Sequence, residues 1–461
     1  MSAFRADRPS ERAVLVTAVL GTMLLPLNST MVAVALPRIV DDLGASISAS
    51  AWLVSGYLIA QAALQPLSGK LGDRLGRRPL ILYGLASFAL VSLGAALAPS
   101  LAVLMVFRVL QAVAGALVLP NAFGLVRELL PAARRGRAFG LLGSAIGLAA
   151  AAGPPLGGAL VGLGGWRAIF LVNLPWVAVT LWFALRSVPR PAAAVGARFD
   201  TVGAVALSAL LCGTAWLLNP GAVSAWVPPL VAAALGCLTA GFLRYELRRD
   251  DPVFQPRFLR VRSFAAATGS VGLSNLALYG TLLAVPVLLS HRAGWSAAEI
   301  GLALAAMSLP MAAMSPIGGW LSDHAGRRTA AVAGLALLSG ALVPLALAGA
   351  DVAGPVLVGS LAIAGAGIGL SNAAVQAAGI EALDPNDAGI AAGIFSTGRY
   401  LGGIAAASLV AALATGAGAR YGLLFGVEAL AAALSTIFAT MLPGRHPAPV
   451  AEELAARLPA T

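Results

Sequence analysis

Three ionisable residues stand inside long apolar stretches of this sequence and could carry chemistry there. They are Arg108, Arg399 and Glu428. Ionisable side chains at membrane depth are costly, and they mark pathways for ions, protons or substrates. A carboxylate in such a place can bind and release a proton, and an arginine can hold an anionic group. The surrounding stretches must then be membrane spans, which their length and composition can test.

The composition favours a polytopic helical membrane protein. The chain of 461 residues is 59% hydrophobic and 11% charged, and its mean hydropathy is +0.88. Apolar runs of about 20 residues recur along it, each long enough to cross a ~30 Å hydrocarbon core, and such runs in lipid must be helical. We predict an all-α protein with fourteen transmembrane helices, at 13–36, 50–69, 79–98, 101–123, 138–163, 166–186, 201–218, 226–244, 263–290, 296–320, 329–349, 353–375, 388–415 and 420–442.

The distribution of basic residues predicts the topology. Of the 30 Lys and Arg, 24 fall in segments on one side of the predicted spans, four on the other side and two within spans. Because basic residues accumulate in cytoplasmic segments, both termini are predicted to be cytoplasmic in a multi-pass protein of the inner or plasma membrane. The net charge of +11 then reflects topology and contact with anionic membrane lipids, and no nucleic-acid partner is expected. The first apolar run, about 24 residues long, is predicted to be a span and not a cleaved signal peptide.

An internal repeat divides the chain. The decapeptide GKLGDRLGRR at 69–78 returns as GWLSDHAGRR at 319–328, an offset of 250 residues with six identical positions. Equal helix number and equal starting orientation in the two halves indicate parallel repeats, an arrangement found in one large class of secondary transporters. The predicted organisation is a cytoplasmic tail at 1–12, a six-helix bundle at 13–186, two extra helices with cytoplasmic linkers at 187–262, a second six-helix bundle at 263–442 and a cytoplasmic tail at 443–461.

Several motifs in order resemble one transporter family. They are LNSTMVAVALP (27–37), AWLVSGYLIAQAALQPLSG (51–69), the decapeptide at 69–78, RVLQAVAGAL (108–117), GPPLGG (153–158) and FDTVGAVAL (199–207). Together they resemble the fourteen-helix drug:proton antiporter family of the major facilitator superfamily, over nearly the whole chain. The resemblance implies a secondary active transporter that exports drug-like or antibiotic organic compounds by proton antiport and alternating access. A small organic molecule and protons would be its partners, and a monomer is expected.

The repeated decapeptide is the predicted gating motif. Its glycines would let helix ends approach closely, and its paired arginines would anchor those ends at the anionic leaflet. The resemblance implies that Asp73, and Asp323 in the other half, latch the cytoplasmic sides of the two halves together. The alternative is a pair of topology-setting basic loops. The motif residues are Gly69, Asp73, Gly76, Arg77, Arg78, Asp323, Gly326, Arg327 and Arg328.

The glycines and prolines of GPPLGG predict a bend in the fifth span. Proline removes a backbone donor and kinks a helix, while glycine permits close packing. The resemblance implies that this antiporter kink seals the outer side against the second half, and an ordinary kink is the alternative. Its residues are Gly153, Pro154, Pro155, Gly157 and Gly158.

Proton coupling is the least direct part of the resemblance. The family's fourth-helix motif, here Arg108 and Gln111, is linked to coupling; snorkelling of Arg108 to the outer interface is the alternative. The family's first-helix motif usually has an Asp where this chain has Asn28, and asparagine cannot titrate. Glu428 is the candidate replacement acid, or else a glutamate that is hydrogen-bonded near the outer interface. The scarcity of acids favours neutral, zwitterionic or anionic substrates, and Arg108 and Arg399 would support an anionic group.

A substrate cavity is expected between the halves, as in other transporters built from two repeats. Each polar candidate could equally make an interhelical hydrogen bond. The candidates are Asn28, Trp52, Tyr57, Gln61, Asn121, Asn275, Tyr279 and Arg399.

Other classes of function find no support in the sequence. The three histidines are far apart, and Cys212 and Cys237 are interpreted as apolar packing residues, so neither a metal nor another cofactor is expected. Hydrolase, zinc-protease and ATP-binding motifs are absent, which argues against an enzyme or an ATP-driven pump. The remaining alternative is an uncoupled or differently coupled major facilitator transporter of one metabolite. The acidic stretch EALDPNDAG (381–389) would pair with cytoplasmic arginines or be solvated.

Overall fold

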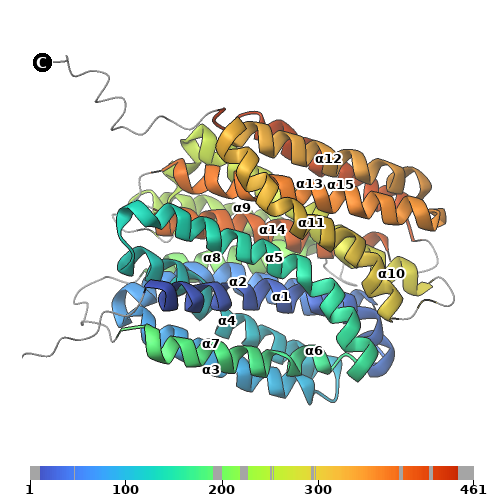
Figure 1. Ribbon diagram of the computed structural model, residues 1–461, viewed down its shortest axis with the longest axis horizontal. Helices are drawn as coiled ribbons and strands as arrows, with labels where there is room; N and C mark the ends of the chain where they lie inside the picture. The colour runs from blue at the N-terminus through green and yellow to red at the C-terminus, as the bar shows by residue number, and fades with distance from the viewer. Residues whose placement is uncertain are drawn as a thin grey trace, which may run out of the picture.

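A computed structural model gives the arrangement of the helices (Figure 1). It describes residues 11–45, 47–189, 200–218, 227–249, 252, 254–291, 295, 297–383, 388–414 and 419–444. Within these ranges the chain is almost entirely helical and contains no strand. The predicted tails, most of the linker after residue 189 and the connection at 219–226 lie outside the described residues.

Fifteen α-helices and two short 3-10 helices follow one another along the described chain. The first seven α-helices are α1 (Glu11–Leu43), α2 (Ile47–Leu75), α3 (Arg77–Ala96), α4 (Leu101–Leu129), α5 (Ala132–Gly164), α6 (Ala168–Leu171) and α7 (Asn173–Ser187). Next come α8 (Thr201–Leu218), α9 (Val227–Glu246) and η1 (Pro256–Arg260). The last group is α10 (Arg262–His291), α11 (Ala297–Ala325), α12 (Arg327–Ala348), η2 (Gly349–Asp351), α13 (Gly354–Glu381), α14 (Ala388–Leu413) and α15 (Tyr421–Ala439).

Eleven apolar segments of the described chain are long enough to cross a membrane, by length and composition. They correspond to α1, α3, α4, α5, the α6–α7 pair, α9, α10, α11, α12, α13 and α15. Helices α2, α8 and α14 lie at three further predicted spans and are outside this set. The predicted number of fourteen spans therefore stays a prediction.

The two six-helix groups pack in the same pattern. In the first, α1 packs against α5 and α7, while α4 packs against α2 and α3. In the second, α10 packs against α14 and α15, while α13 packs against α11 and α12. The equivalent pairs agree with the repeat in the sequence, because a repeated apolar pattern buries the same helix faces. Figure 1 shows the first group in blue to green and most of the second group, in yellow to red, above it.

Two pairs of helices form most of the contact between the groups. Helix α5 packs along α11, and α2 packs along α14. Helix α1 also meets α10 between these two seams. A relative movement of the groups would therefore have to change these contacts.

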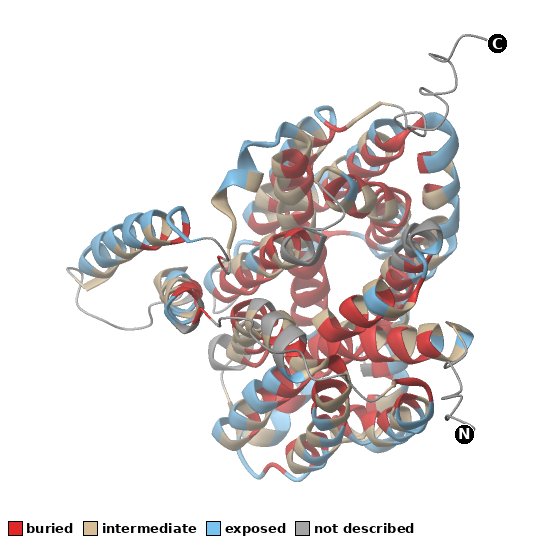
Figure 2. Cartoon of the chain, turned by 90° about the vertical axis from the view of Figure 1, so that its left-hand side faces the viewer, coloured by how far each residue is buried: buried red, intermediate tan, exposed pale blue. Residues whose placement is uncertain are grey.

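The helices α8 and α9 stand beside the α2–α14 seam. Helix α8 packs on both α2 and α14, so it contacts both groups, and α9 packs on α8. Only 6% of the most apolar stretch of α9 is buried within the protein. Figure 2 shows this pair set off to the left of the main bundle, with the outer helix mostly exposed. Cys212 and Cys237 on this pair are free and exposed, so they are not packing residues as predicted.

Candidate functional site

A group of polar side chains, most of them buried and two of them (Arg399 and Tyr400) partly buried, lies where the two groups of helices meet. We call it the central polar cluster. It consists of Asn28 on α1, Tyr57 and Gln61 on α2, Arg108 and Gln111 on α4, Tyr279 on α10, and Arg399 and Tyr400 on α14. Sequence analysis singled out all of these residues except Tyr400.

Arg108 is the centre of the cluster on the first group of helices. Its side chain is 1% exposed, so it does not snorkel to an interface as the alternative interpretation required. Its Nη1 donates to the Asn28 amide oxygen and, at 3.0 Å, to Gln111 Oε1. Its Nε donates to the Leu53 carbonyl at 3.3 Å. The guanidinium lies over the Tyr57 ring, 4.0 Å from the ring centre, which adds a cation–π contact.

A hydrogen-bonded chain fixes Gln111 behind Arg108. The Gln111 amide donates to Ser92 Oγ at 2.8 Å, and Asn173 donates to the same oxygen at 3.3 Å. These residues are all buried and come from α4, α3 and α7. Because each partner restrains the next, the Gln111 oxygen is held toward Arg108.

Arg399 supplies the second cation, from the other group of helices. Its Nη2 donates to Gln376 Oε1 on α13 at 3.1 Å. Tyr279 on α10 is 8% exposed, and both Arg399 and Arg108 influence its hydroxyl electrostatically. One tyrosine therefore lies in the electrostatic field of cations from both groups of helices.

A direct hydrogen bond joins the halves beside these cations. Gln65 on α2 donates to the Tyr400 hydroxyl on α14 at 2.6 Å and to Gln61 Oε1 at 3.0 Å. Gln61 in turn donates to the Ala112 carbonyl on α4 at 2.9 Å. Gln65 and Tyr400 are not among the candidates from the sequence. The only feature of the sequence that could have indicated them is a polar side chain inside a predicted span.

The remaining cavity candidates lie in different surroundings. Trp52 is partly buried against the apolar core. Asn121 is buried at the α2–α4 contact, where it donates to the Ser68 hydroxyl at 3.0 Å and to two carbonyls. Asn275 donates to Val271 O in its own helix at 2.8 Å. Asn121 thus makes the interhelical hydrogen bond that the alternative interpretation offered, whereas the bond of Asn275 stays within α10.

Glu428 lies apart, between α15 and α10. It is fully buried, and one carboxyl oxygen accepts from the Thr281 hydroxyl at 2.8 Å. The other oxygen, Oε1, has no hydrogen-bond partner among the described residues, and it lies close to Gly280. Glu428 is therefore a buried acid that contacts α10, the helix that carries Tyr279.

The glycines of GPPLGG bring α5 against two other helices. Gly153 and Gly157 face α1, at Thr30 and Met31. Gly158 faces the other group of helices, since a methyl group built on Gly301 of α11 would lie 2.7 Å from the Gly158 Cα. Pro154 and Pro155 lie within α5 beside these contacts. At this seam the two halves meet backbone to backbone.

The two copies of the GRR turn have the same geometry. Gly76 and Gly326 have φ of 86° and 91°, a region that favours glycine, and each ends one helix just before the next begins. The second arginine of each copy reaches the end of the last helix in its group. Arg78 donates to the carbonyls of Leu185 and Val188, and Arg328 Nε donates to the Leu442 carbonyl at 2.8 Å.

The first arginine of each copy forms an ion pair within its own group. Arg77 donates to Glu128 at the end of α4. Arg327 donates to both oxygens of Glu381 at the end of α13, each at 2.6 Å. Arg77 and Arg327 are 5% and 6% exposed, so the predicted anchoring at lipid headgroups is wrong for these two. The pairing predicted for the acidic stretch is confirmed at Glu381.

The aspartates of the gating motif are less well placed for a latch. Asp323 is exposed, and its Oδ1 lies 4.0 Å from Nη1 of Arg327, four residues further along the same copy of the motif. The Asp73 side chain lies outside the described residues. A Cβ built on Gly69 would make only an ordinary contact, 3.8 Å from the Pro120 Cβ, so close approach does not require glycine there.

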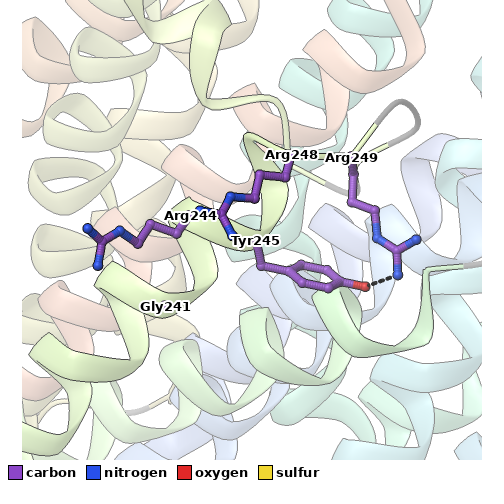
Figure 3. A pocket seen from close by; sticks show the side chains of 5 residues that line it. All are labelled: Gly241, Arg244, Tyr245, Arg248 and Arg249. Carbon is purple, nitrogen blue, oxygen red and sulfur yellow. Dashed lines mark hydrogen bonds between the residues drawn. The ribbon is translucent and has the colours of Figure 1, made fainter.

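A small basic pocket lies at the end of α9. It has a volume of about 430 Å³ and is lined by Gly241, Arg244, Tyr245, Arg248 and Arg249 (Figure 3). Arg249 donates to the Tyr245 hydroxyl at 2.6 Å, and that hydroxyl donates to Asp200 Oδ1 at 2.7 Å. Asp200 also accepts from the Gly203 amide at 3.0 Å and so caps α8. The pocket is therefore tied to the start of the neighbouring helix.

Comparison with known proteins agrees with this architecture. The family model described as Major Facilitator Superfamily matches residues 18–242 and 267–460. The chain is 34% identical over 419 residues to the Bacillus subtilis protein named uncharacterized MFS-type transporter YvkA, covering 91% of this chain and 94% of that one. It is 30% identical over 404 residues to a Mycobacterium tuberculosis multidrug resistance protein B homolog, covering 86% and 75%.

Two further similarities extend the comparison. The tetracenomycin C resistance and export protein of Streptomyces glaucescens is 34% identical over 343 residues, covering 73% of this chain and 63% of that protein. The fold matches the crystal structure of the human organic anion transporter MFSD10 with a TM-score of 0.65 over 94% of this chain and all of that one, at 20% identity. The family match spans most of the sequence and the helices pack as two equivalent groups: the chain belongs to the major facilitator superfamily and is a multi-pass membrane transporter, not an enzyme.

Proposed function

We propose that the protein is a secondary active transporter that exports drug-like or antibiotic organic compounds across the plasma membrane by proton antiport. The central polar cluster carries this proposal, because a buried polar site at the meeting point of two equivalent helix groups is where such transporters bind substrate. The names of two relatives, a multidrug resistance protein and an antibiotic resistance and export protein, support export of this class of compound.

Alternating access requires the two groups to rock around the central polar cluster. In the present arrangement Asn28, Gln61 and Gln111 are fully buried, while Arg399 and Tyr400 are partly exposed. Substrate could reach the fully buried part of the cluster only after the α5–α11 or α2–α14 seam changes. We place the closed gate on one side at Gly158 and Gly301, with the repeated GRR turns bracing the other side.

We propose Glu428 as the proton carrier. It is a fully buried carboxyl with one oxygen that has no partner within the described part of the chain, and its Thr281 partner lies two residues from Tyr279 on α10. A change in the charge of Glu428 can therefore alter the position of α10 and reach the central polar cluster through the same helix. Asn28 cannot serve in this role because an amide does not titrate.

The membrane arrangement is part of the same proposal. Fourteen spans with both termini in the cytoplasm would place the GRR turns and the basic pocket on the cytoplasmic side. The arginines of that pocket, Arg244, Arg248 and Arg249, would then meet anionic lipid headgroups, which attract juxtamembrane basic residues.

Export can be tested in bacteria that lack their main drug exporters. Cells that produce the protein should accumulate less of at least one fluorescent or antibiotic compound than cells that produce the double variant Arg108→Gln and Arg399→Gln. Equal membrane levels of both proteins, checked by immunoblot, exclude a difference in expression. Identical accumulation across a broad panel would contradict export of drug-like compounds and favour transport of one specific metabolite.

A further inference from the structure

We propose that the central polar cluster selects organic anions, so that the exported compounds are aromatic or amphipathic molecules with one negative group. This inference rests on the proposed function and names its substrate class. The observation behind it is the combination of two cations from opposite halves with hydrogen-bond donors that have no acceptor.

The charge of Arg108 has no carboxylate partner among the described residues. The groups that accept from it are amide and carbonyl oxygens, which solvate a guanidinium without neutralising it. Its titratable neighbours are Tyr57 and Tyr279. Those of Arg399 are Tyr279 and Tyr400, and a tyrosine carries no charge at neutral pH. Neither of the two positive charges therefore has an anionic partner among the described residues. A buried charge without a counter-ion is costly.

Unused donors point to a ligand that accepts hydrogen bonds. Arg108 Nη2, Arg399 Nε and Asn28 Nδ2 are buried and have no acceptor among the described residues. The Asn28 amide must present its oxygen to Arg108, so its NH₂ group faces elsewhere as a further donor. A carboxylate or sulfonate offers several acceptor sites in a plane that suits guanidinium groups, whereas a cationic ligand offers none.

Tyrosine rings add a surface for an aromatic body. Tyr57 lies under the Arg108 guanidinium, and Tyr279 is the buried aromatic side chain that α10 contributes from the other group of helices. A ring system between them would be stabilised by aromatic contact and by the adjacent cations. The expected ligand thus combines an anionic group with a flat apolar part.

The residue at position 28 determines whether the site favours anionic ligands. An aspartate at this position would accept the same hydrogen bond from Arg108 and would neutralise it inside the protein. The asparagine keeps the geometry and leaves the charge for a ligand. Asn28→Asp should therefore weaken anion binding while the contact with Arg108 persists.

Binding of three naphthalene compounds that differ in charge tests this inference. The probes are naphthalene-2-sulfonate, 2-naphthylmethanol and 2-naphthylmethylammonium, measured by equilibrium dialysis against the full protein in nanodiscs. We expect the sulfonate to bind at least about 10-fold more tightly than the other two, because its group meets charged donors. Arg108→Gln and Arg399→Gln should each weaken sulfonate binding by about 10- to 150-fold, the range for loss of a hydrogen bond to a charged group.

Matched variants separate charge from folding. Arg108→Lys keeps the charge and should retain part of the preference. Arg420→Gln removes an exposed basic residue just before α15, outside the cluster and the basic pocket, and should leave the preference unchanged. Asn28→Asp should abolish it. Sulfonate binding no tighter than that of the neutral or cationic probe, absence of binding at millimolar concentrations, or an unchanged preference in Arg108→Gln would each overturn the anion site.

Failure of this inference and failure of the proposed function give different results. Tight sulfonate binding without reduced accumulation of any compound in cells would retain the anion site and contradict export. Export of cations with no binding of the sulfonate would retain export and overturn the anion site.

Discussion

A close backbone approach between the two halves predicts a strong effect of a single methyl group. A Cβ added at Gly301 would lie 2.7 Å from the Gly158 Cα, and backbone cannot rotate out of the way. The helices α5 and α11 would have to separate by about 0.7 Å to restore an ordinary contact, which a closely packed interface resists. Overpacking of this kind costs about 1–3 kcal/mol. If α5 and α11 separate in the other arrangement of the transport cycle, only the arrangement with this seam closed bears that cost.

We therefore expect Gly301→Ala to shift the population from closed to open by roughly 5- to 150-fold, the factor that corresponds to this energy. Spin labels at Leu163 and Leu302, which are exposed near the same end of α5 and α11, report the separation of the two helices. Wild-type protein should give mainly the short distance, and Gly301→Ala should enrich a longer one. Cys212 and Cys237 are replaced by serine beforehand, since both are free and exposed.

Gly319→Ala is the matched control. Gly319 lies on the same helix, and nothing lies within 4 Å of a Cβ built there. This variant should keep the wild-type distances and transport rate. A distance distribution in Gly301→Ala that equals the control, in protein that elutes as a single folded species, would refute the view that this contact holds the halves closed.

Three further variants test the ion pairs, the turns and the bridge between halves. Arg327→Lys cannot donate the two parallel bonds to Glu381, so thermal unfolding in detergent should show a loss of about 1.5–3 kcal/mol; an unchanged midpoint would mean that the paired bonds contribute nothing. Gly326→Ala should lose about 1–3 kcal/mol in the same assay because its φ of 91° strains any residue with a Cβ, and equal stability would argue against that conformation. Tyr400→Phe removes the acceptor of the Gln65 amide and should weaken the closed arrangement by about 0.5–1.5 kcal/mol, seen as a shift in the spin-label distances, while identical distances would show that the bond does not restrain the halves.

The internal repeat of the sequence predicts most of the fold. Long apolar runs can only be helices in lipid, and the offset of 250 residues between the two GRR copies indicates two equivalent groups. The contacts of Arg78 and Arg328 with the last helix of each group follow the same equivalence. Arg77 shows where this reasoning fails, since a basic residue at a helix start can face lipid headgroups or a carboxylate of a neighbouring helix. Arg77 pairs with Glu128 because of the way α3 packs against α4.

The candidate site was predicted residue by residue but not as a set of contacts. Asn28 is a candidate because it replaces the usual aspartate of the first-helix motif, and Arg108 because it is an arginine within a predicted span. Their hydrogen bond is a property of how α1 crosses α4, which periodicity does not determine. Gln65 and Tyr400 are 335 residues apart, and neither stands out in its own span. Such pairs emerge only when the helices of opposite halves are placed side by side.

Proton movement driven by substrate is the most direct test of the proposed antiport. The purified protein is reconstituted in liposomes that contain a pH-sensitive dye, a pH gradient is imposed, and neutral, cationic and anionic antibiotics are added in turn. We expect an anionic compound to trigger proton flux in the wild type, and Glu428→Gln to abolish that flux while substrate binding remains. Substrate movement without any proton flux in the wild type would contradict antiport and would leave an uncoupled transporter.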